Sequence, residues 1–376
     1  MCTSFAICVL LMEKRTTVID GFYALLRFSV GESEDFSVNL TSDEWFGVYQ
    51  MAQQQALLGL LFCGVERNGH TAIPEELLQQ WSRMYRQIRK LNAWCNRVAV
   101  DVSGFFGQHG IRNCILKGQG IALIYSDPSV RMCGDIDVWV EGGVEKTLTF
   151  VRQFVPDAKT DCHHVEFGQM NGVEVEVHFS PAFVNNPIHN RRMQRWFAQM
   201  ANEQFSHVAE LPDGVGTVSV PTTAFNRIFL LAHLSHHLFY EGIGLRQVVD
   251  YYYVIKQGFT EEERREDERL LKWLGLYDVA GAVMYVLGEV LHLSEKEMIV
   301  PADERRGRFL QNEIMQSGNM GKYDERVSSR GNKVARNWWR LVRDMRMVWY
   351  FPSECLWEPF FRFYHYCWRK KHNRVR

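Results

Sequence analysis

Two short segments in which acidic and aliphatic residues alternate constrain the fold of this chain more than any other feature. GDIDVWV (134–140) places two aspartates between aliphatic residues, and VEVEVH (173–178) places two glutamates and a histidine between valines. Successive side chains of a β-strand point to opposite faces of the sheet. Each segment therefore predicts a half-buried strand with one acidic face. If the two strands are neighbours with matched faces, carboxylates gather on one side of the sheet.

The residues around these strands predict a small mixed α/β unit from residue 107 to residue 181. IRNCIL (111–116) is typical of a short strand, and GQGIALIYS (118–126) is typical of a helix. Asn171-Gly172 separates two strand-like segments and is a strong signal for a two-residue hairpin turn. The predicted sheet therefore ends in a β-hairpin.

Helical patterns on both sides of this unit make the predicted fold class α+β: a small mixed β-sheet core flanked by N-terminal and C-terminal helical regions. Thr41 and Glu44 have the spacing of a capping box, and a long helical pattern follows Pro74. We expect a disordered leader (1–11), an N-terminal helical region (12–106), the α/β core (107–181), a second helical region (182–293), a polar, mobile connection (294–332) and a basic-aromatic helical segment (333–376).

Composition excludes several classes of protein. The chain has 43 basic and 44 acidic residues, so no global positive field indicates a nucleic-acid partner. Its 9 cysteines form no Cys-x-x-Cys pair, which argues against a disulfide framework and for a reducing, cytoplasmic location. No segment has the apolar length of a membrane span, so we expect no integral membrane association. No sequence feature indicates a homo-oligomer.

The acidic faces predict a bound cation. Two charges about 4 Å apart repel by about 4 kcal/mol at an effective dielectric of about 20. Lys117 and Arg131 offset part of this repulsion, but a divalent cation does so better, and carboxylate oxygens suit Mg²⁺. The alternative is a solvent-facing sheet surface on which the acids are hydrated. The turn LKGQG (116–120) favours the cation site, because Gly118 and Gly120 allow an anion to approach the backbone closely.

These motifs together resemble a known family. ILKGQGIALIYSDPSVRMCGDIDVWV (115–140), then VEVHF (175–179), then HLSHH (233–237) before GLRQVVDYY (244–252), is similar to the bacterial uncharacterised nucleotidyltransferases. That family is a branch of the polymerase-β-type nucleotidyltransferase superfamily. The similarity covers about residues 22–369 and is densest between the Lys-Gly turn and the acid-x-His motif.

The resemblance implies a role for each motif. The expected metal ligands and catalytic residues are Asp135, Asp137 and Glu176, with Glu174 on the same strand face as the alternative third acid. The expected nucleotide-binding residues are Lys117, Gly118, Gln119 and Arg131. Two Mg²⁺ ions are expected during catalysis.

The implied reaction moves a nucleoside monophosphate from an NTP to a hydroxyl of an unknown acceptor and releases pyrophosphate. The acceptor is a small molecule, a protein or RNA. The alternative is a non-catalytic nucleotide-binding or interaction module that keeps the fold. A partner that modifies a cognate toxin is a third interpretation, and no sequence feature selects it.

Several polar residues outside these motifs have simpler interpretations. The pair His163-His164 lacks further zinc ligands at suitable sequence spacing, so we do not expect a zinc site there. The three histidines of HLSHH share one helix face and are expected to form a structural surface or a pocket wall. Arg246 and Asp250 are four residues apart and are expected to pair along a helix.

The last forty residues interleave basic and aromatic side chains. Such a segment stacks on RNA or lies on a membrane in some proteins. We expect instead that its aromatic face packs onto the domain while the arginine stems point outward.

Overall fold

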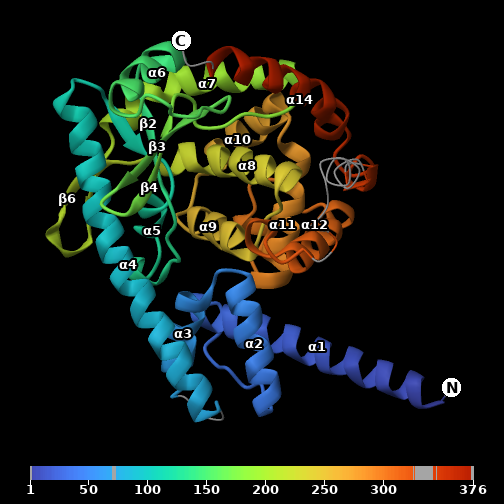
Figure 1. Ribbon diagram of the computed structural model, residues 1–376. Coiled ribbons are helices and arrows are strands. Elements are labelled where there is room, and N and C mark those ends of the chain that lie inside the picture. The colour runs from blue at the N-terminus through green and yellow to red at the C-terminus, as the bar shows by residue number, and fades with distance from the viewer. Residues whose placement is uncertain (1, 70–72, 325, 327–341, 344, 374–376) are drawn as a thin grey trace.

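The structure is a computed structural model that describes residues 2–69, 73–324, 326, 342–343 and 345–373. A four-stranded sheet lies between the long helix α4 (Glu75–Gln108) and a body of helices from the C-terminal half of the chain (Figure 1). The predicted α+β fold class is confirmed. The sheet is therefore in contact with helices on both sides, and one of these contacts encloses the candidate site.

The N-terminal region consists of α1 (Cys2–Val30), α2 (Ser42–Gln54), α3 (Leu58–Arg67) and α4. The capping box that starts α2 is formed as predicted, with Thr41 and Glu44 each bonded to the other's backbone. Helix α1 begins at Cys2 and crosses the expected end of a disordered leader at residue 11. No glycine or proline occurs between residues 2 and 20, so nothing in the sequence interrupts the helix.

The sheet contains β1 (Asn113–Ile115), β2 (Ile136–Val140), β4 (Val173–His178) and β3 (His164–Met170), in that spatial order. Strands β2 and β4 are parallel neighbours, and their register pairs Asp137 with Glu176. The predicted hairpin joins β3 to β4. Asn171 and Gly172 have φ angles of 52° and 81°, as a type I′ turn requires. The two acidic strands are thus adjacent with matched faces.

The two faces of the sheet have different partners. The aliphatic face packs on α4 and on α6 (Gly143–Phe154), in a cluster that contains Val98, Val102, Ile136, Val138, Leu148, Val151, Val175 and Val177. The polar face carries Asp137, Glu176 and His178 and is directed toward α8 (Thr223–Tyr240) and α9 (Leu245–Ile255). The alternation of apolar and acidic residues therefore separates a hydrophobic core from a polar cavity.

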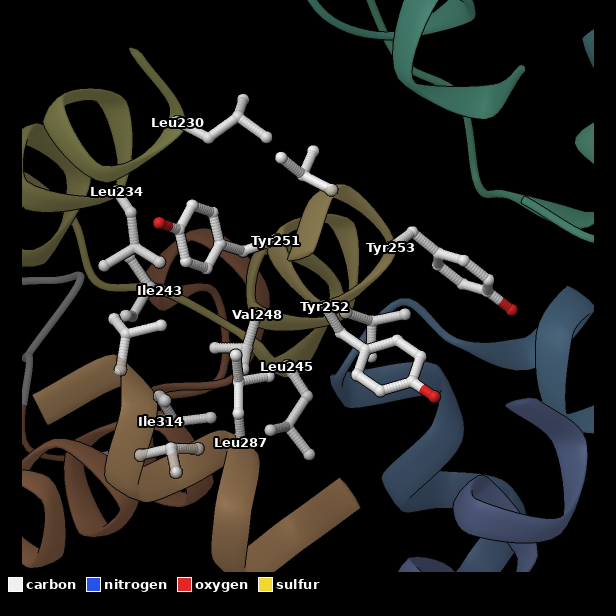
Figure 2. Close-up of a cluster of buried hydrophobic side chains, with 14 of the residues drawn as sticks. Leu230, Leu234, Ile243, Leu245, Val248, Tyr251, Tyr252, Tyr253, Leu287 and Ile314 are labelled. Carbon is white, nitrogen blue, oxygen red and sulfur yellow. The ribbon is translucent and has the colours of Figure 1, made fainter. Parts of the chain in front are cut away.

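The helical body is held together by a second, larger core. Besides α8 and α9, the helical body contains α7 (Pro187–Ser206), α10 (Glu261–Leu274), α11 (Tyr277–Leu291), α12 (Glu304–Ser317) and α14 (Pro352–His372). Figure 2 shows Val248 of α9 near Leu287 of α11 and Ile314 of α12, and Tyr251 of α9 near Leu234 of α8, all buried. Short elements complete the fold: α5 (Gln119–Ala122), β5 (Val208–Leu211), β6 (Gly216–Ser219) and the 3-10 turns η1 (Pro128–Val130), η2 (Pro212–Gly214), η3 (Glu295–Glu297) and η4 (Asn319–Gly321).

Part of the segment 294–332, expected to be a polar, mobile connection, is helical in the structure. Residues 304–317 form α12, in which Leu310 and Ile314 are fully buried. Gly307 lies so close to Tyr285 that an added Cβ would be 2.3 Å from the tyrosine side chain. The segment was expected to be a connection because its composition is polar, but the helix has a narrow apolar stripe. Residue 325 and residues 327–332 lie outside the described part.

The expected packing of the C-terminal segment is also wrong in part. Helix α14 buries Glu354, Cys355, Glu358, Phe361 and His365. Its exposed side chains include Leu356, Trp357, Phe360, Phe363 and Tyr364. Most of the aromatic side chains therefore face away from the domain, and two carboxylates face inward. Among the described residues, no helix has both the length and the apolar character to cross a membrane.

Candidate active site

A cavity of about 220 Å³ lies between the polar face of the sheet and helices α8 and α9. The sheet and the segments that lead into it supply Lys117, Asp135, Asp137, Glu176 and His178 to its wall, and the helices supply His233, His236, Arg246 and Asp250. Figure 1 shows α8 and α9 on the side of the sheet opposite α4. Ionisable groups from five separate stretches of sequence thus surround one cavity.

Three carboxylates converge in this cavity. Asp137 and Glu176 are paired across β2 and β4, and Asp135 immediately precedes β2. The negative charge of Asp137, followed by burial, raises the pKa of Asp135 above its ordinary value. Asp135 forms no ion pair or side-chain hydrogen bond with any of the described residues. Its charge is therefore incompletely balanced by the protein.

Asp137 is the most connected of the three. Its Oδ1 accepts a hydrogen bond from Lys117 Nζ at 2.8 Å and lies 2.8 Å from Nε2 of His178. Burial acts to raise the pKa of Asp137, but Lys117 and His178 outweigh burial and hold the pKa well below its ordinary value. Burial acts to lower the pKa of Lys117, and the charges of Asp137 and Asp135 outweigh it, so that pKa is raised. Both groups are therefore charged at neutral pH.

His178 connects Asp137 to Glu176. Its Nε2 lies 3.6 Å from Glu176 Oε2, and hydrogen bonds to both acids raise the pKa of His178 despite its burial. Burial would raise the pKa of Glu176, but the hydrogen bond with His178 outweighs it and lowers that pKa. One ligand atom from each of Asp137, Glu176 and His178 lies within 4.8 Å of the others. This arrangement has the dimensions of a metal site.

The comparison with known families matches this geometry. A family model described as uncharacterised nucleotidyltransferase matches residues 41–292, which is two thirds of the chain. The chain belongs to this nucleotidyltransferase family. The matched range includes every residue of the cavity wall named above, and it is narrower than the similarity expected for residues 22–369. No curated protein shows significant similarity to the chain.

Nucleotidyltransferases generally use divalent metals, and Asp137, Glu176 and His178 form a group that could hold such an ion. Carboxylate oxygens are the ligands that Mg²⁺ prefers. Asp135 forms no ion pair among the described residues, and the charge of Asp137 raises its pKa although Lys117 acts to lower it. A divalent cation between these groups would remove that repulsion.

The structure distinguishes the two candidates for the third acid of the nucleotidyltransferase site. Glu174 shares a strand face with Glu176, as expected, but it is exposed and accepts a hydrogen bond from Gln169 at 2.7 Å. Glu174 does not line the cavity that contains Asp137. Glu176 does, so the geometry favours Glu176.

The Lys-Gly turn is only partly as expected for a nucleotide-binding element. Lys117 and Gly118 line the cavity, and Gly118 has a φ of 54°. The expected helix is the four-residue turn α5, too short for a helix dipole to attract an anion. Gln119 is buried, and its Nε2 donates to Asn92 O and to Asn96 Oδ1 of α4. The expectation that Gln119 contacts nucleotide is not supported, because its amide is held by α4.

The two arginines of the cavity wall have partners that differ from those expected. Arg131, expected to bind nucleotide, makes two hydrogen bonds of 2.7 and 2.8 Å with the carboxylate of Asp250. Arg246, expected to pair with Asp250, instead donates to the backbone oxygen of Met132 at 2.8 Å. Arg246 forms no ion pair within the described part of the chain, and burial followed by the charge of Arg131 lowers its pKa. Arg246 is therefore a half-buried cation that forms no ion pair among the described residues.

The histidines of HLSHH line the cavity, in agreement with the expected pocket wall, whereas the position of His163 and His164 beside His178 was not predicted. Pairing of β3 with β4 sets His164 opposite His178, and His163 lies 5.2 Å from His178 between ring centroids. Burial lowers the pKa of His163, His233 and His236 well below the ordinary value, so these imidazoles are neutral. The signal in the sequence was present, because an HH pair at the start of one hairpin strand lies opposite the end of the other.

Proposed function

We propose that the protein is a Mg²⁺-dependent nucleotidyltransferase that moves a nucleoside monophosphate from an NTP to a hydroxyl of an acceptor and releases pyrophosphate. The observation that carries this proposal is the convergence of Asp135, Asp137 and Glu176 in one cavity of a chain that belongs to a nucleotidyltransferase family. A structural ion-pair network would balance all three acids. Here Asp135 forms no ion pair among the described residues, and the attraction of Lys117 does not outweigh the repulsion from Asp137, which supports a site for a divalent ion.

The three acids would hold Mg²⁺ through their carboxylate oxygens. When bound, Mg²⁺ neutralises the phosphates of an NTP and lowers the pKa of an attacking hydroxyl. His178 and Lys117 fix the orientation of Asp137 through its Oδ1. Glu176 is ionised, because hydrogen bonding with His178 lowers its pKa, and it accepts the proton of the acceptor hydroxyl.

Lys117 and Arg246 bind the phosphates in this proposal. Both line the cavity, and Arg246 has hydrogen-bonding capacity left, since its Nε has no partner among the described atoms. A guanidinium presents paired N–H groups that match phosphate oxygens. Arg131 uses its Nε–H and an Nη2–H on Asp250, so this pair fixes one edge of its guanidinium, and we assign the main phosphate contact to Arg246 instead. Arg246 therefore takes the role that the sequence suggested for Arg131.

The cellular setting belongs to the same proposal. The cysteines whose side chains the structure describes are all free, which agrees with a reducing, cytoplasmic location. The acceptor is a small molecule, a protein or RNA, and pyrophosphate release measured with each class of acceptor separates these three.

The test is pyrophosphate release from each NTP, with Mg²⁺ or with chelator, in the presence of small hydroxyl compounds, proteins or RNA as acceptors. We expect Mg²⁺-dependent release with one acceptor class. Asp137→Asn should lower the rate by about 1,000-fold or more, because ion placement acts mainly in the transition state. Glu174→Gln is the matched control and should keep the wild-type rate. Mg²⁺-dependent NTP binding without pyrophosphate release from any acceptor would instead support a non-catalytic binding module.

A further inference from the structure

Three imidazoles form a compact triangle at one end of the cavity. The ring centroids of His163, His164 and His178 are separated by 4.5, 5.2 and 5.3 Å. One ring nitrogen of each lies within 4.8 Å of the others. Three imidazoles on one tetrahedral ion, with metal–nitrogen bonds of about 2.1 Å, have ring centroids about 5 Å apart. The triangle therefore already has the dimensions of a metal-bound set.

Glu176 adds an oxygen to this triangle. Its Oε2 lies 3.8 Å from His164 Nδ1, which in turn lies 3.2 Å from His163 Nε2. Neighbouring ligands on a tetrahedral ion with bonds of about 2.1 Å lie about 3.4 Å apart. His163, His164 and Glu176 thus offer two nitrogens and one carboxylate oxygen at distances close to those of a single coordination sphere, and His178 has a ring nitrogen within 4.8 Å of both histidine nitrogens.

The orientation of His178 resembles that of a histidine ligand. Its Nε2 bonds to Asp137, while its Nδ1 is buried and has no partner among the described atoms. Histidines that bind a metal through one nitrogen usually donate the other N–H to a carboxylate, which fixes the ring. Asp137 occupies the position of that carboxylate, and Nδ1 is left free to bind an ion.

We propose that His163, His164, His178 and Glu176 form a second metal site, selective for Zn²⁺ or a similar transition-metal ion over Mg²⁺. Imidazole nitrogens favour zinc-like ions, whereas Mg²⁺ prefers oxygen ligands. The site adjoins the Mg²⁺ site through Glu176 but does not use Asp135. It does not depend on the proposed reaction, and Asp135 separates the two sites experimentally.

A competing set of ligands is adjacent and must be excluded. Asp161, Cys162 and His163 also lie within 4.8 Å of one another. Asp161 is already paired with His365 of α14 and accepts a hydrogen bond from the backbone N–H of Cys162. This acid is therefore engaged in structural contacts, which favours the three-histidine set.

The test uses the full chain, stripped of metal with a chelator and titrated with ZnCl₂ and, in parallel, with MgCl₂, by calorimetry. We expect one Zn²⁺ equivalent that 100-fold excess Mg²⁺ does not displace. His164→Gln should weaken Zn²⁺ binding at least 10-fold, since loss of even an outer partner of a ligand costs about 10–100-fold in affinity. Asp135→Asn should keep the wild-type Zn²⁺ affinity while losing Mg²⁺ binding.

His237→Gln is the matched control, because His237 lines the same cavity but bonds to Glu241 and lies outside the cluster. It should bind Zn²⁺ as the wild type does. Equal Zn²⁺ affinity in wild type and folded His164→Gln would overturn the proposal, as would the absence of stoichiometric binding to the wild type.

The spectrum of the Co²⁺-loaded wild type provides a readout that needs no variant. Coordination by nitrogen and oxygen alone gives visible bands without a strong thiolate charge-transfer band, which is the expected result. A strong thiolate band that disappears in Cys162→Ser would assign the ion to Asp161, Cys162 and His163 and would refute the site proposed here.

Discussion

Two buried carboxylates on the cavity wall, Asp137 and Asp250, are each paired with a cation from the segment 117–131, yet their surroundings differ. Asp250 receives two hydrogen bonds from Arg131, at 2.7 and 2.8 Å, and a third from the hydroxyl of Tyr125 at 2.6 Å. Asp137 receives a single contact from Lys117 and one from His178, both on Oδ1. Both carboxylate oxygens of Asp250 therefore have hydrogen-bond partners within the protein, whereas the contacts of Asp137 all fall on one oxygen.

The difference indicates that the carboxylate of Asp250 holds the fold together, whereas that of Asp137 is available to a ligand. A bidentate guanidinium pair fixes geometry and ties α9 to the chain before β2, since Asp250 lies in α9. A lysine is a point charge on a flexible stem and does not fix its partner to the same extent. Asp137 also has two acidic neighbours, Asp135 and Glu176, that lack a full set of cations. We therefore expect Asp250 to contribute mainly to the stability of the fold and Asp137 to act mainly in the proposed reaction.

The largest effect on stability is expected for Asp250→Asn. This change leaves the buried guanidinium of Arg131 without an anion, and breaking a buried pair typically costs about 3–5 kcal/mol. Chemical denaturation should report this loss in the free energy of unfolding. Asp127→Asn is the control, because the pair of Asp127 with Arg89 is largely exposed and its loss should cost less than about 1 kcal/mol. An Asp250 variant as stable as the control would break the comparison.

A third buried carboxylate shows what burial costs without a cation. Glu354 of α14 accepts a hydrogen bond from the backbone N–H of Asn185, its Oε1 has no partner among the described atoms, and burial raises its pKa to about 7. A carboxyl with a raised pKa in the folded state stabilises the fold below its unfolded pKa. That contribution is lost as the pH rises through about 7.

We therefore expect the free energy of unfolding to fall by about 2–3 kcal/mol between pH 5 and pH 8 because of Glu354 alone. Glu354→Gln should remove most of this dependence and should be more stable than wild type at pH 8. Unfolding curves of both proteins across this pH range provide the measurement. Parallel pH profiles for the two proteins would show that Glu354 does not titrate as described.

The smallest of these effects is expected for Arg246→Gln, and it concerns binding rather than folding. Loss of a phosphate contact should weaken NTP binding by about 10–100-fold, equivalent to about 1.4–2.7 kcal/mol. Stability should be unchanged or higher, because Arg246 is a half-buried cation without an ion-pair partner among the described residues, and desolvation lowers its pKa. Arg246→Lys should recover part of the affinity. Arg112→Gln, which changes an exposed pair with Glu141, is the control and should bind NTP normally.

The sequence predicted local features of the site more reliably than distant ones. Alternation in β2 and β4 predicted the shared acidic face, and Asn171-Gly172 predicted the hairpin, because both patterns depend on backbone geometry within a few residues. Pairing of Arg131 with Asp250, 119 residues away, had no local signal. The four-residue spacing of Arg246 and Asp250 suggested a different partner, and a bidentate tertiary contact replaced it.

Burial was the other quantity that the sequence did not provide. Gln119 looked available for nucleotide, but α4 supplies Asn92 and Asn96 as partners for its amide. The aromatic face of the C-terminal segment was expected to pack inward, whereas α14 turns Glu354 inward. In both cases the orientation of an entire helix determines the environment of a side chain, and that orientation depends on the full tertiary fold.

The most direct test measures two quantities on the same pair of variants, Asp137→Asn and Asp250→Asn: the free energy of unfolding and Mg²⁺-dependent NTP affinity. We expect Asp137→Asn to lose Mg²⁺-dependent NTP binding while losing far less stability than Asp250→Asn, since relief of repulsion with Asp135 offsets part of the lost contact with Lys117. The folded fraction of Asp250→Asn should bind NTP close to normally. An Asp137→Asn protein that binds NTP as tightly as wild type, and is destabilised as much as Asp250→Asn, would contradict the account.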